Sequence, residues 1–132
     1  MGFPSRIALV PYWLRDNPQH LHLSDHRWWL EHLQMYDCIV FLGPYIHDSL
    51  WFAEDGRRRI SIKTNSLFID IQEVFDKRLC SHGITPNHVS LYWHVMEVSA
   101  TCRVVNLQIL SCPRICVIGD THHMSRPITG LY

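Results

Sequence analysis

The sequence lacks the features that mark several common classes of protein. No apolar run approaches the roughly 20 residues that cross a membrane, and the start of the chain has no apolar stretch of signal-peptide length. Lys and Arg together number 12, as do Asp and Glu, so the basic surplus that is typical of nucleic-acid binders is missing. We therefore expect no membrane span and no nucleic-acid partner.

Familiar cofactor and catalytic motifs are missing as well. The sequence contains no G-x-G-x-x-G, no Walker loop and no G-x-S-x-G elbow. Its five cysteines form no C-x-x-C pair, and Cys38, Cys80 and Cys116 lie inside apolar runs. This placement favours reduced, buried thiols. We therefore expect a cytoplasmic protein, and we predict no cofactor.

What the sequence does contain predicts one globular domain. The 132 residues are 47% hydrophobic and 18% charged, which excludes disorder and suffices for a single core. We expect residues 1–132 to form one domain, either alone or as the amino-terminal half of a longer two-domain protein. Ten histidines are the one unusual count, and near pH 6 they would add positive charge.

Short, continuous apolar runs predict strands that are buried on both faces, as in a parallel sheet. The continuous runs are 7–10, 38–42 and 115–118. We also expect strands at 60–62, where apolar residues alternate with a serine, and at 89–93, which is strand-like. Between them we expect helices at about 24–36, at 48–56, at 66–81 and from about 99 to Pro113. The clearest is 66–81, whose apolar side chains repeat on one helical face. Asn65 can cap this helix, and Gly83 follows its end.

This alternation of strands and helices predicts an α/β fold. We expect a single Rossmann-like domain, with an open, mostly parallel sheet and helices on both of its faces. In such sheets ligands bind beyond the carboxyl ends of the strands.

The first candidate site follows the last predicted strand. Asp120, Thr121, His122 and His123 come directly after it. A carboxylate and two imidazoles on a tight loop can accept a proton, bind a metal or hydrogen-bond to sugar hydroxyls. The plain structural alternative is that Asp120 caps a turn and that the histidines are merely exposed.

A second polar cluster follows the first predicted strand. It comprises His20, His22, Asp25 and His26. Three imidazoles this close together can bind zinc or nickel, but the spacing matches no closed metal site, and Asp25 also suits the start of a helix. We predict that the cluster contributes ligand contacts rather than a metal site.

The pair Asp120-x-His122 after a strand matches the opening motif of metallophosphoesterases. Such two-metal sites need further Asp, His and Asn-His ligands downstream, and few residues remain after His123. A metal-dependent hydrolase is therefore an alternative function. A further alternative is a non-catalytic assembly module that covers its sheet edge by forming a homodimer.

The stretch ICVIGDTHHMSRPI at 115–128, with LHLSDHRWWLEHL at 21–33 and HGITPNHV at 82–89, resembles the amino-terminal half of bacterial GT-B glycosyltransferase-like proteins. The resemblance implies two facing Rossmann-like domains, of which the amino-terminal one shapes the acceptor side. It also implies metal-free catalysis, with Asp120, His122 or His123 as the base by position.

The resemblance implies as partner a sugar or a nucleotide-sugar-related small molecule. The donor-binding domain of such enzymes has no counterpart in the 132 residues. We therefore expect that this chain does not transfer sugars by itself.

Overall fold

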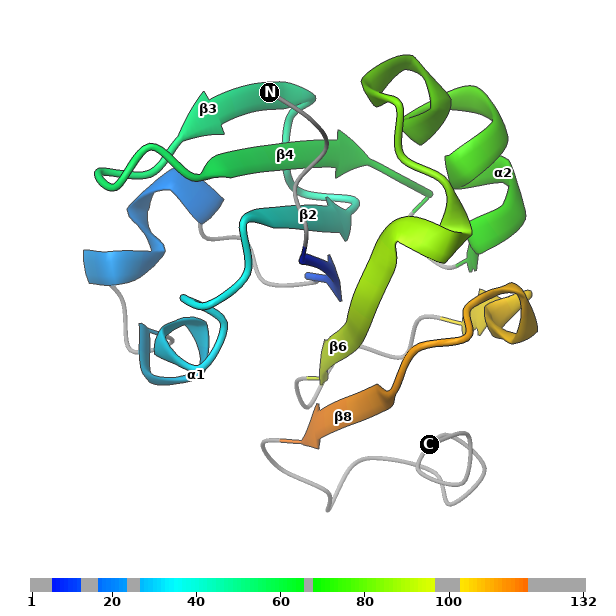
Figure 1. Cartoon of the computed structure of the whole chain (residues 1–132). Helices are drawn as coiled ribbons and strands as arrows, with labels where there is room; N and C mark the ends of the chain where they lie inside the picture. The colour runs from blue at the N-terminus through cyan, green and yellow to red at the C-terminus, as the bar shows by residue number, and fades with distance from the viewer. Residues whose placement is uncertain (1–5, 13–16, 24–26, 66–67, 97–102, 119–132) are drawn as a thin grey trace.

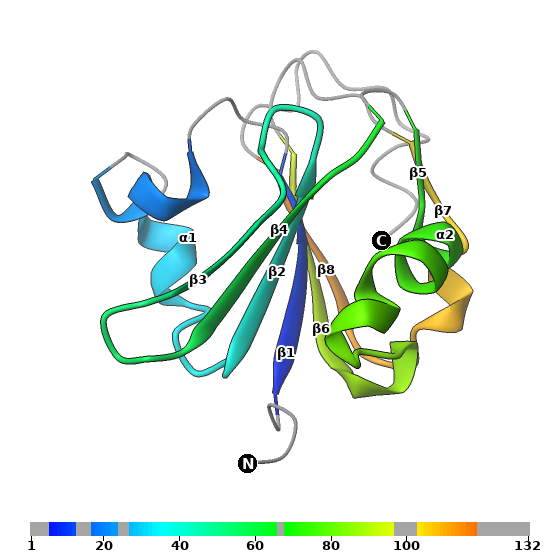
Figure 2. The same ribbon diagram turned by 90° about the horizontal axis from the view of Figure 1, so that it is seen from above.

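The structure is a computed structural model that describes residues 6–12, 17–23, 27–65, 68–96 and 103–118. A six-stranded sheet runs through the middle of the molecule (Figure 1). Helix α1 (Arg27–Glu31) lies against one face and helix α2 (Ile71–Lys77) against the other (Figure 2).

The strand order in the sheet is β3-β4-β2-β1-β6-β8. Every neighbouring pair is parallel except β3 and β4, which form an antiparallel hairpin at one edge. The bounds of these strands are Ile7–Pro11 (β1), Cys38–Gly43 (β2), Ser49–Phe52 (β3), Arg58–Lys63 (β4), Val89–Met96 (β6) and Arg114–Ile118 (β8). A separate parallel pair joins β5 (Phe68–Asp70) to β7 (Arg103–Val105).

The order of the strands reverses between β1 and β6. The chain first builds outward from β1 to β2 and β4, and then returns to the other side of β1 to add β6 and β8. Because parallel crossovers are right-handed, building in opposite directions places the connections on opposite faces. The first crossover carries α1 and the 3-10 helix η1 (Pro18–Leu23), and the return crossover carries α2.

Apolar side chains fill both faces, which explains the continuous apolar runs. In β1, Ile7 and Leu9 pack with α2, whereas Ala8 and Val10 pack with α1. Short 3-10 helices complete the α2 side. They are η2 (Leu79–His82), η3 (Pro86–His88) and η4 (Leu107–Ile109).

The prediction of a helix at 48–56 is wrong, because this segment forms β3 and the hairpin turn. Leu50 and Phe52 are exposed, and they alternate with the half-buried Ser49 and Trp51. This period of two is that of a strand with a solvated face. Gly56 has a φ of 83° in the turn, so the residue expected to end a helix instead provides the left-handed conformation of the hairpin turn.

The helix predicted at 66–81 is shorter than expected, and residues 66 and 67 lie outside the described residues. Residues 68–70 form β5, and α2 begins at Ile71 with Asp70 rather than Asn65 as its cap. The end of this region is as predicted, since Gly83 has a left-handed φ of 73° after η2.

The other two predicted helices are also shorter or absent where the structure describes them. α1 covers only Arg27–Glu31 of the predicted 24–36. The stretch that was expected to be helical before Pro113 contains β7 and η4 instead. The fold is thus α/β with a mostly parallel mixed sheet, but the described residues contain only two α-helices. No helix in these residues is long and apolar enough to cross a membrane.

Candidate ligand site at the carboxyl edge of the sheet

The carboxyl ends of β1, β2, β4, β6 and β8 lie at one edge of the sheet, because these strands are mutually parallel. In open α/β sheets the crevice outside this edge binds ligands where the strand order reverses. Here that place is between β1 and β6. The geometry thus assigns the candidate site to the edge that the sequence indicated.

At this edge the ends of β1 and β2 approach very closely. Tyr12 continues β1, and its backbone N–H donates to the carbonyl of Leu42. A Cβ atom added to Gly43 would lie 1.9 Å from the carbonyl oxygen of Tyr12. Only glycine leaves room for this contact, so Gly43 fixes the spacing of the two strand ends.

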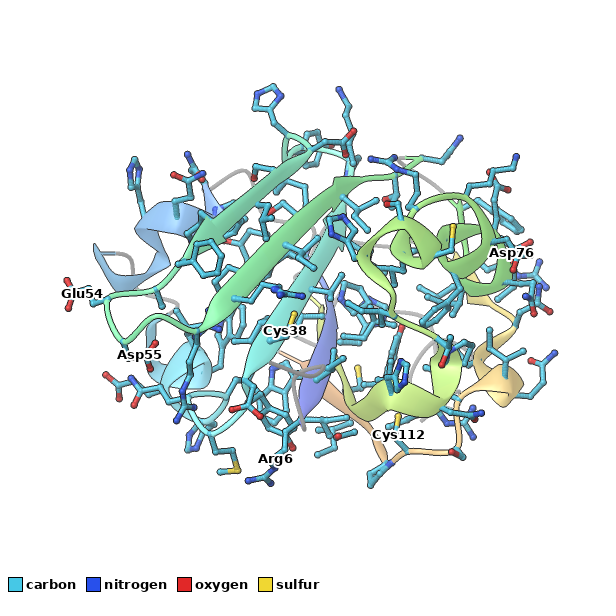
Figure 3. The ribbon with its side chains drawn as sticks, turned by 45° about the horizontal axis from the view of Figure 1, so that its top comes forward. Arg6, Cys38, Glu54, Asp55, Asp76 and Cys112 are labelled. Atoms are coloured by element: carbon cyan, nitrogen blue, oxygen red, sulfur yellow. The ribbon has the colours of Figure 1, made fainter. Side chains whose placement is uncertain are left out.

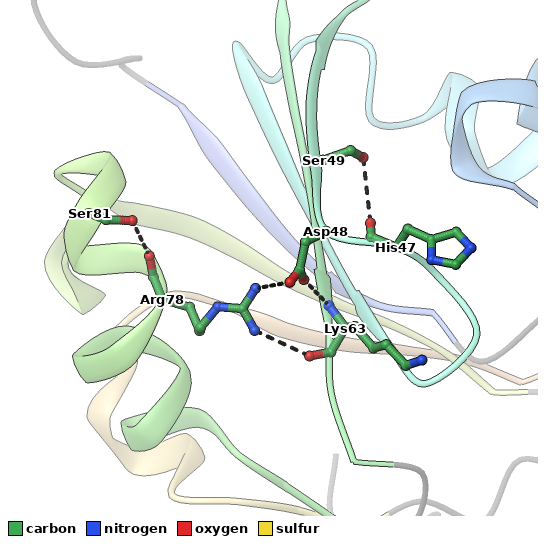
Figure 4. Close-up of polar contacts among 6 residues, drawn as sticks. All are labelled: His47, Asp48, Ser49, Lys63, Arg78 and Ser81. Atoms are coloured by element: carbon green, nitrogen blue, oxygen red, sulfur yellow. Dashed lines mark hydrogen bonds and ion pairs between the residues drawn. The ribbon is translucent and has the colours of Figure 1, made fainter.

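An ionic network holds the carboxyl end of β4 (Figure 4). Oδ1 of Asp48 accepts a hydrogen bond of 2.8 Å from the backbone N–H of Lys63, and Oδ2 lies 2.6 Å from Nη2 of Arg78. Nη1 of Arg78 also donates to the carbonyl of Lys63 at 3.5 Å. Three segments that are distant in sequence are thereby joined: the loop before β3, the end of β4 and the end of α2.

The network also sets the protonation of Asp48. Burial by itself would raise the pKa of this carboxyl, but the hydrogen bonds from Arg78 and Lys63 and their charges lower it below its ordinary value of 3.8. Asp48 is therefore ionised at neutral pH and acts as a fixed acceptor.

A cavity of about 400 Å³ opens beside this network, between the end of β4, β5 and α2. Its polar lining mixes donors and acceptors, including Lys63, Thr64, Asp70, Glu73 and Lys77. Asp70 is held by hydrogen bonds from Gln72 N at 3.0 Å and from Asn106 Nδ2 at 2.8 Å. The lining also includes Arg78, whose charge is compensated by its ion pair with Asp48 outside the lining. With that pair counted, the charges offset one another, and the lining suits an uncharged ligand rich in hydroxyl groups.

A buried histidine lies near the carboxyl end of β6, beside the reversal point. His94 is 1% exposed, and its Nδ1 is 3.2 Å from the hydroxyl of Tyr92. Burial lowers the pKa of His94 to about 4, so the imidazole is neutral at ordinary pH. Sequence analysis missed this residue because nothing in a strand-like run shows which way a histidine points.

The thiols near the sheet are not activated. His94 is paired in register with Cys116 on β8, and burial raises the pKa of the Cys116 thiol to about 11. Burial also raises the pKa of Cys38 to about 11, although the charges of Arg58 and Arg59 oppose it. Because the thiolate is the nucleophile, neither of these cysteines is suited to nucleophilic catalysis.

Most of the residues predicted from the sequence as a site lie outside the described residues. These are Asp120, Thr121, His122, His123, Asp25 and His26. The described chain ends at Ile118, at the carboxyl end of β8. His20 and His22 both belong to η1, in the crossover that follows β1, and His20 is exposed.

Among the residues that the structure describes, no three His, Cys, Asp or Glu side chains are placed to share a metal ion. Asp48 and Arg78 were also missed by sequence analysis. The sequence contained one indication of Asp48, which is a polar residue soon after the predicted strand 38–42. Because Asp48 was assigned to the predicted helix 48–56, it was not considered as a site residue.

Comparison with known proteins identifies no relative of this chain. No family model, no curated protein and no solved structure matches the chain.

Proposed function

We propose that the chain is a Rossmann-like domain that binds a sugar, or a similarly hydroxyl-rich small molecule, at the carboxyl edge of its sheet. The observation that carries this proposal is the reversal of strand order between β1 and β6. Numbered along the chain, the five parallel strands follow the order 3-2-1-4-5, which is typical of Rossmann sheets.

The chemistry of the edge supports a polar, uncharged ligand. A sugar hydroxyl both donates and accepts hydrogen bonds, and the cavity beside β4 offers lysine ammonium groups together with the carboxylates of Asp70 and Glu73. A phosphate would need uncompensated positive charge, but two of the three cations in the described lining are already paired, Arg78 with Asp48 and Lys77 with Glu73.

The role that we propose is that of the acceptor-side domain of a GT-B-type glycosyltransferase, or of a stand-alone relative. In the enzymatic form, a base at Asp120, His122 or His123 accepts the proton of the acceptor hydroxyl. The hydroxyl oxygen then bonds to the anomeric carbon of the donor, and the bond from that carbon to the leaving group breaks. The chain by itself supplies acceptor binding and the base.

A thermal-shift series on the full chain tests this proposal. Free sugars and nucleotide-sugars are screened for a rise in melting temperature, and the screen is repeated with Asp120→Asn and His122→Ala. We expect both variants to lose the ligand-induced rise while the unliganded melting temperature stays the same.

The matched controls are Asp76→Asn on the exposed side of α2 and His82→Ala in η2, which should keep the rise. The proposal is wrong if no sugar or nucleotide-sugar raises the melting temperature, or if the control variants lose the rise equally. Hydrolysis of a phosphodiester that Mn²⁺ stimulates and Asp120→Asn abolishes would instead support a metallophosphoesterase.

A further inference from the structure

A second cavity lies on the α1 side of the sheet, far from the carboxyl end of β4. It measures about 430 Å³ and lies between α1 and the β3–β4 hairpin. Its volume falls within the range of roughly 300–1,000 Å³ that is typical of small-molecule sites. Figure 3 shows Glu54 and Asp55 at the hairpin turn, on the opposite side of the molecule from Asp76 on α2.

The cavity has a flat apolar wall. Trp51 and Phe41 both line it, and their rings stack with centroids 6.0 Å apart and planes 10° apart. Leu30 of α1 contributes a further apolar side chain. Such a wall suits a planar ring, because stacked aromatic groups gain contact beyond the area that they bury.

A buried arginine also lines this cavity. Arg59, the second residue of β4, is only 8% exposed, and it is paired in register with Trp51 and Ile39. A guanidinium group carries five N–H donors. Among the described residues, the Arg59 guanidinium makes one hydrogen bond, from Nη1 to the carbonyl of Arg58 at 2.9 Å.

The nearby carboxylates do not neutralise Arg59 by contact. Asp55 is engaged by Arg57, whose Nε lies 3.1 Å from Oδ2 and whose backbone N–H donates to Oδ1 at 3.0 Å. Within the described chain, Glu54 forms no ion pair with Arg59, although it lines the same cavity. Burial lowers the pKa of Arg59, and the charge of Asp55 opposes that shift only from a distance.

A buried cation without a contacting anion is costly, because desolvation is not repaid by an ion pair. We propose that the cavity binds an aromatic anion, a flat ring that carries one carboxylate or phosphate group, with the anion on Arg59 and the ring against Trp51. A guanidinium fork binds either anion through two parallel hydrogen bonds. This site is independent of the proposed function, which concerns the opposite end of β4.

The test is a titration of the full chain with three probes that share one ring: phenylacetate, phenyl phosphate and the neutral phenylacetamide. Binding is followed by ¹H–¹⁵N spectra, which also show whether Trp51 and Arg59 are affected. We expect at least one anion to bind about tenfold or more tightly than the amide, since the neutral probe lacks the negative charge and the second acceptor oxygen that pair with the guanidinium. The tighter of the two anions identifies carboxylate or phosphate as the preferred group.

Two variants separate charge from packing. Arg59→Met keeps an apolar stem and removes the charge, so the preference for anions should disappear. The matched control is Arg58→Met, because Arg58 precedes it on β4 but is paired in register with Cys38 and thus lies on the opposite face. Trp51→Leu should weaken all three probes to a similar degree.

The unliganded protein offers an independent readout. If the guanidinium has no anion partner, Arg59→Met should melt at the same temperature as the parent chain or higher. The proposal is overturned if phenylacetamide binds as tightly as the anions, if Arg58→Met loses the preference as fully as Arg59→Met, or if no probe binds at about 10 mM. A lower melting temperature for Arg59→Met would equally contradict an unpaired cation.

Discussion

Replacing Gly43 with alanine tests the close approach of β1 and β2 at the proposed ligand edge. The added Cβ would lie 1.9 Å from the carbonyl oxygen of Tyr12, whereas side-chain Cβ atoms essentially never come within 3.0 Å of another atom. The obstacle is backbone, so no flexible side chain can move aside. The strand ends must separate, and the hydrogen bond from Tyr12 N to Leu42 O is stretched with them.

The expected cost combines overpacking with a weakened hydrogen bond. Overpacking of a well-packed site costs about 1–3 kcal/mol, and a backbone hydrogen bond contributes about 1 kcal/mol. We therefore expect Gly43→Ala to lower the free energy of unfolding by about 3 kcal/mol, which for a domain of this size lowers the melting temperature by roughly 10 °C. Calorimetry and urea unfolding measure the two quantities.

Gly56→Ala is the matched control, because its cost has a different origin. No atom lies within 4 Å of the Cβ that would be added, but the φ of 83° is left-handed. This conformation costs a non-glycine residue about 1 kcal/mol. If Gly43→Ala proves no more destabilising than Gly56→Ala, the ends of β1 and β2 are not as close as described, and the reasoning about this edge fails.

Two further predictions concern the buried His94 and the half-buried Asp70. Unfolded His94 takes up a proton near pH 6.5 and folded His94 only near pH 4, so protons favour the unfolded chain, and stability falls as the pH falls through this window. This pKa shift corresponds to about 3 kcal/mol of the free energy of unfolding, which is lost at low pH. His94→Gln should remove this pH dependence. Urea unfolding measures the free energy of unfolding at each pH, and parallel curves for the two proteins would contradict the burial of His94. Asp70→Ala removes the cap of α2 and the hydrogen bond from Asn106, and it should lower the free energy of unfolding by about 1–2 kcal/mol. The exposed control Asp76→Ala should lower it by less than about 0.5 kcal/mol. Equal urea midpoints for the two variants would contradict the role of Asp70 as the cap.

The central strands β1 and β2 were predictable because each of them is buried on both faces. The runs that include Leu9 and Val40 are apolar at every position, and such runs have few alternatives to a central parallel strand. The segment 48–56 was not predictable in the same way. Its Asp48 and Gly56 fit the two ends of a helix and also the start and the turn of a hairpin, and only pairing with β4 decides between them.

The lengths of the helices were overestimated for a similar reason. Ile71, Val74, Phe75 and Leu79 do face the core, as their spacing predicts. The residues before them were diverted into β5 by pairing with β7, a partner more than thirty residues further along the chain. Local periodicity does not contain that information.

The candidate site was only partly visible in the sequence. The sequence predicted parallel strands, and the structure shows that their carboxyl ends share one edge; that a ligand binds at this edge stays a prediction. The contact between Asp48 and Arg78 depends on tertiary structure, since it joins a loop and a helix end through β4. The loop with Asp120, His122 and His123 stays a prediction.

The central claim is that β1 lies parallel to and between β2 and β6, which creates the reversal point. A measurement of cross-strand nuclear Overhauser effects on the labelled full chain tests it most directly. The structure predicts contacts from the backbone of Ala8 to Ile39 on one side and to Leu91 on the other, with the Hα–HN pattern of parallel strands. Strong Hα–Hα contacts between these strands, or the absence of any contact between Ala8 and Leu91, would contradict it.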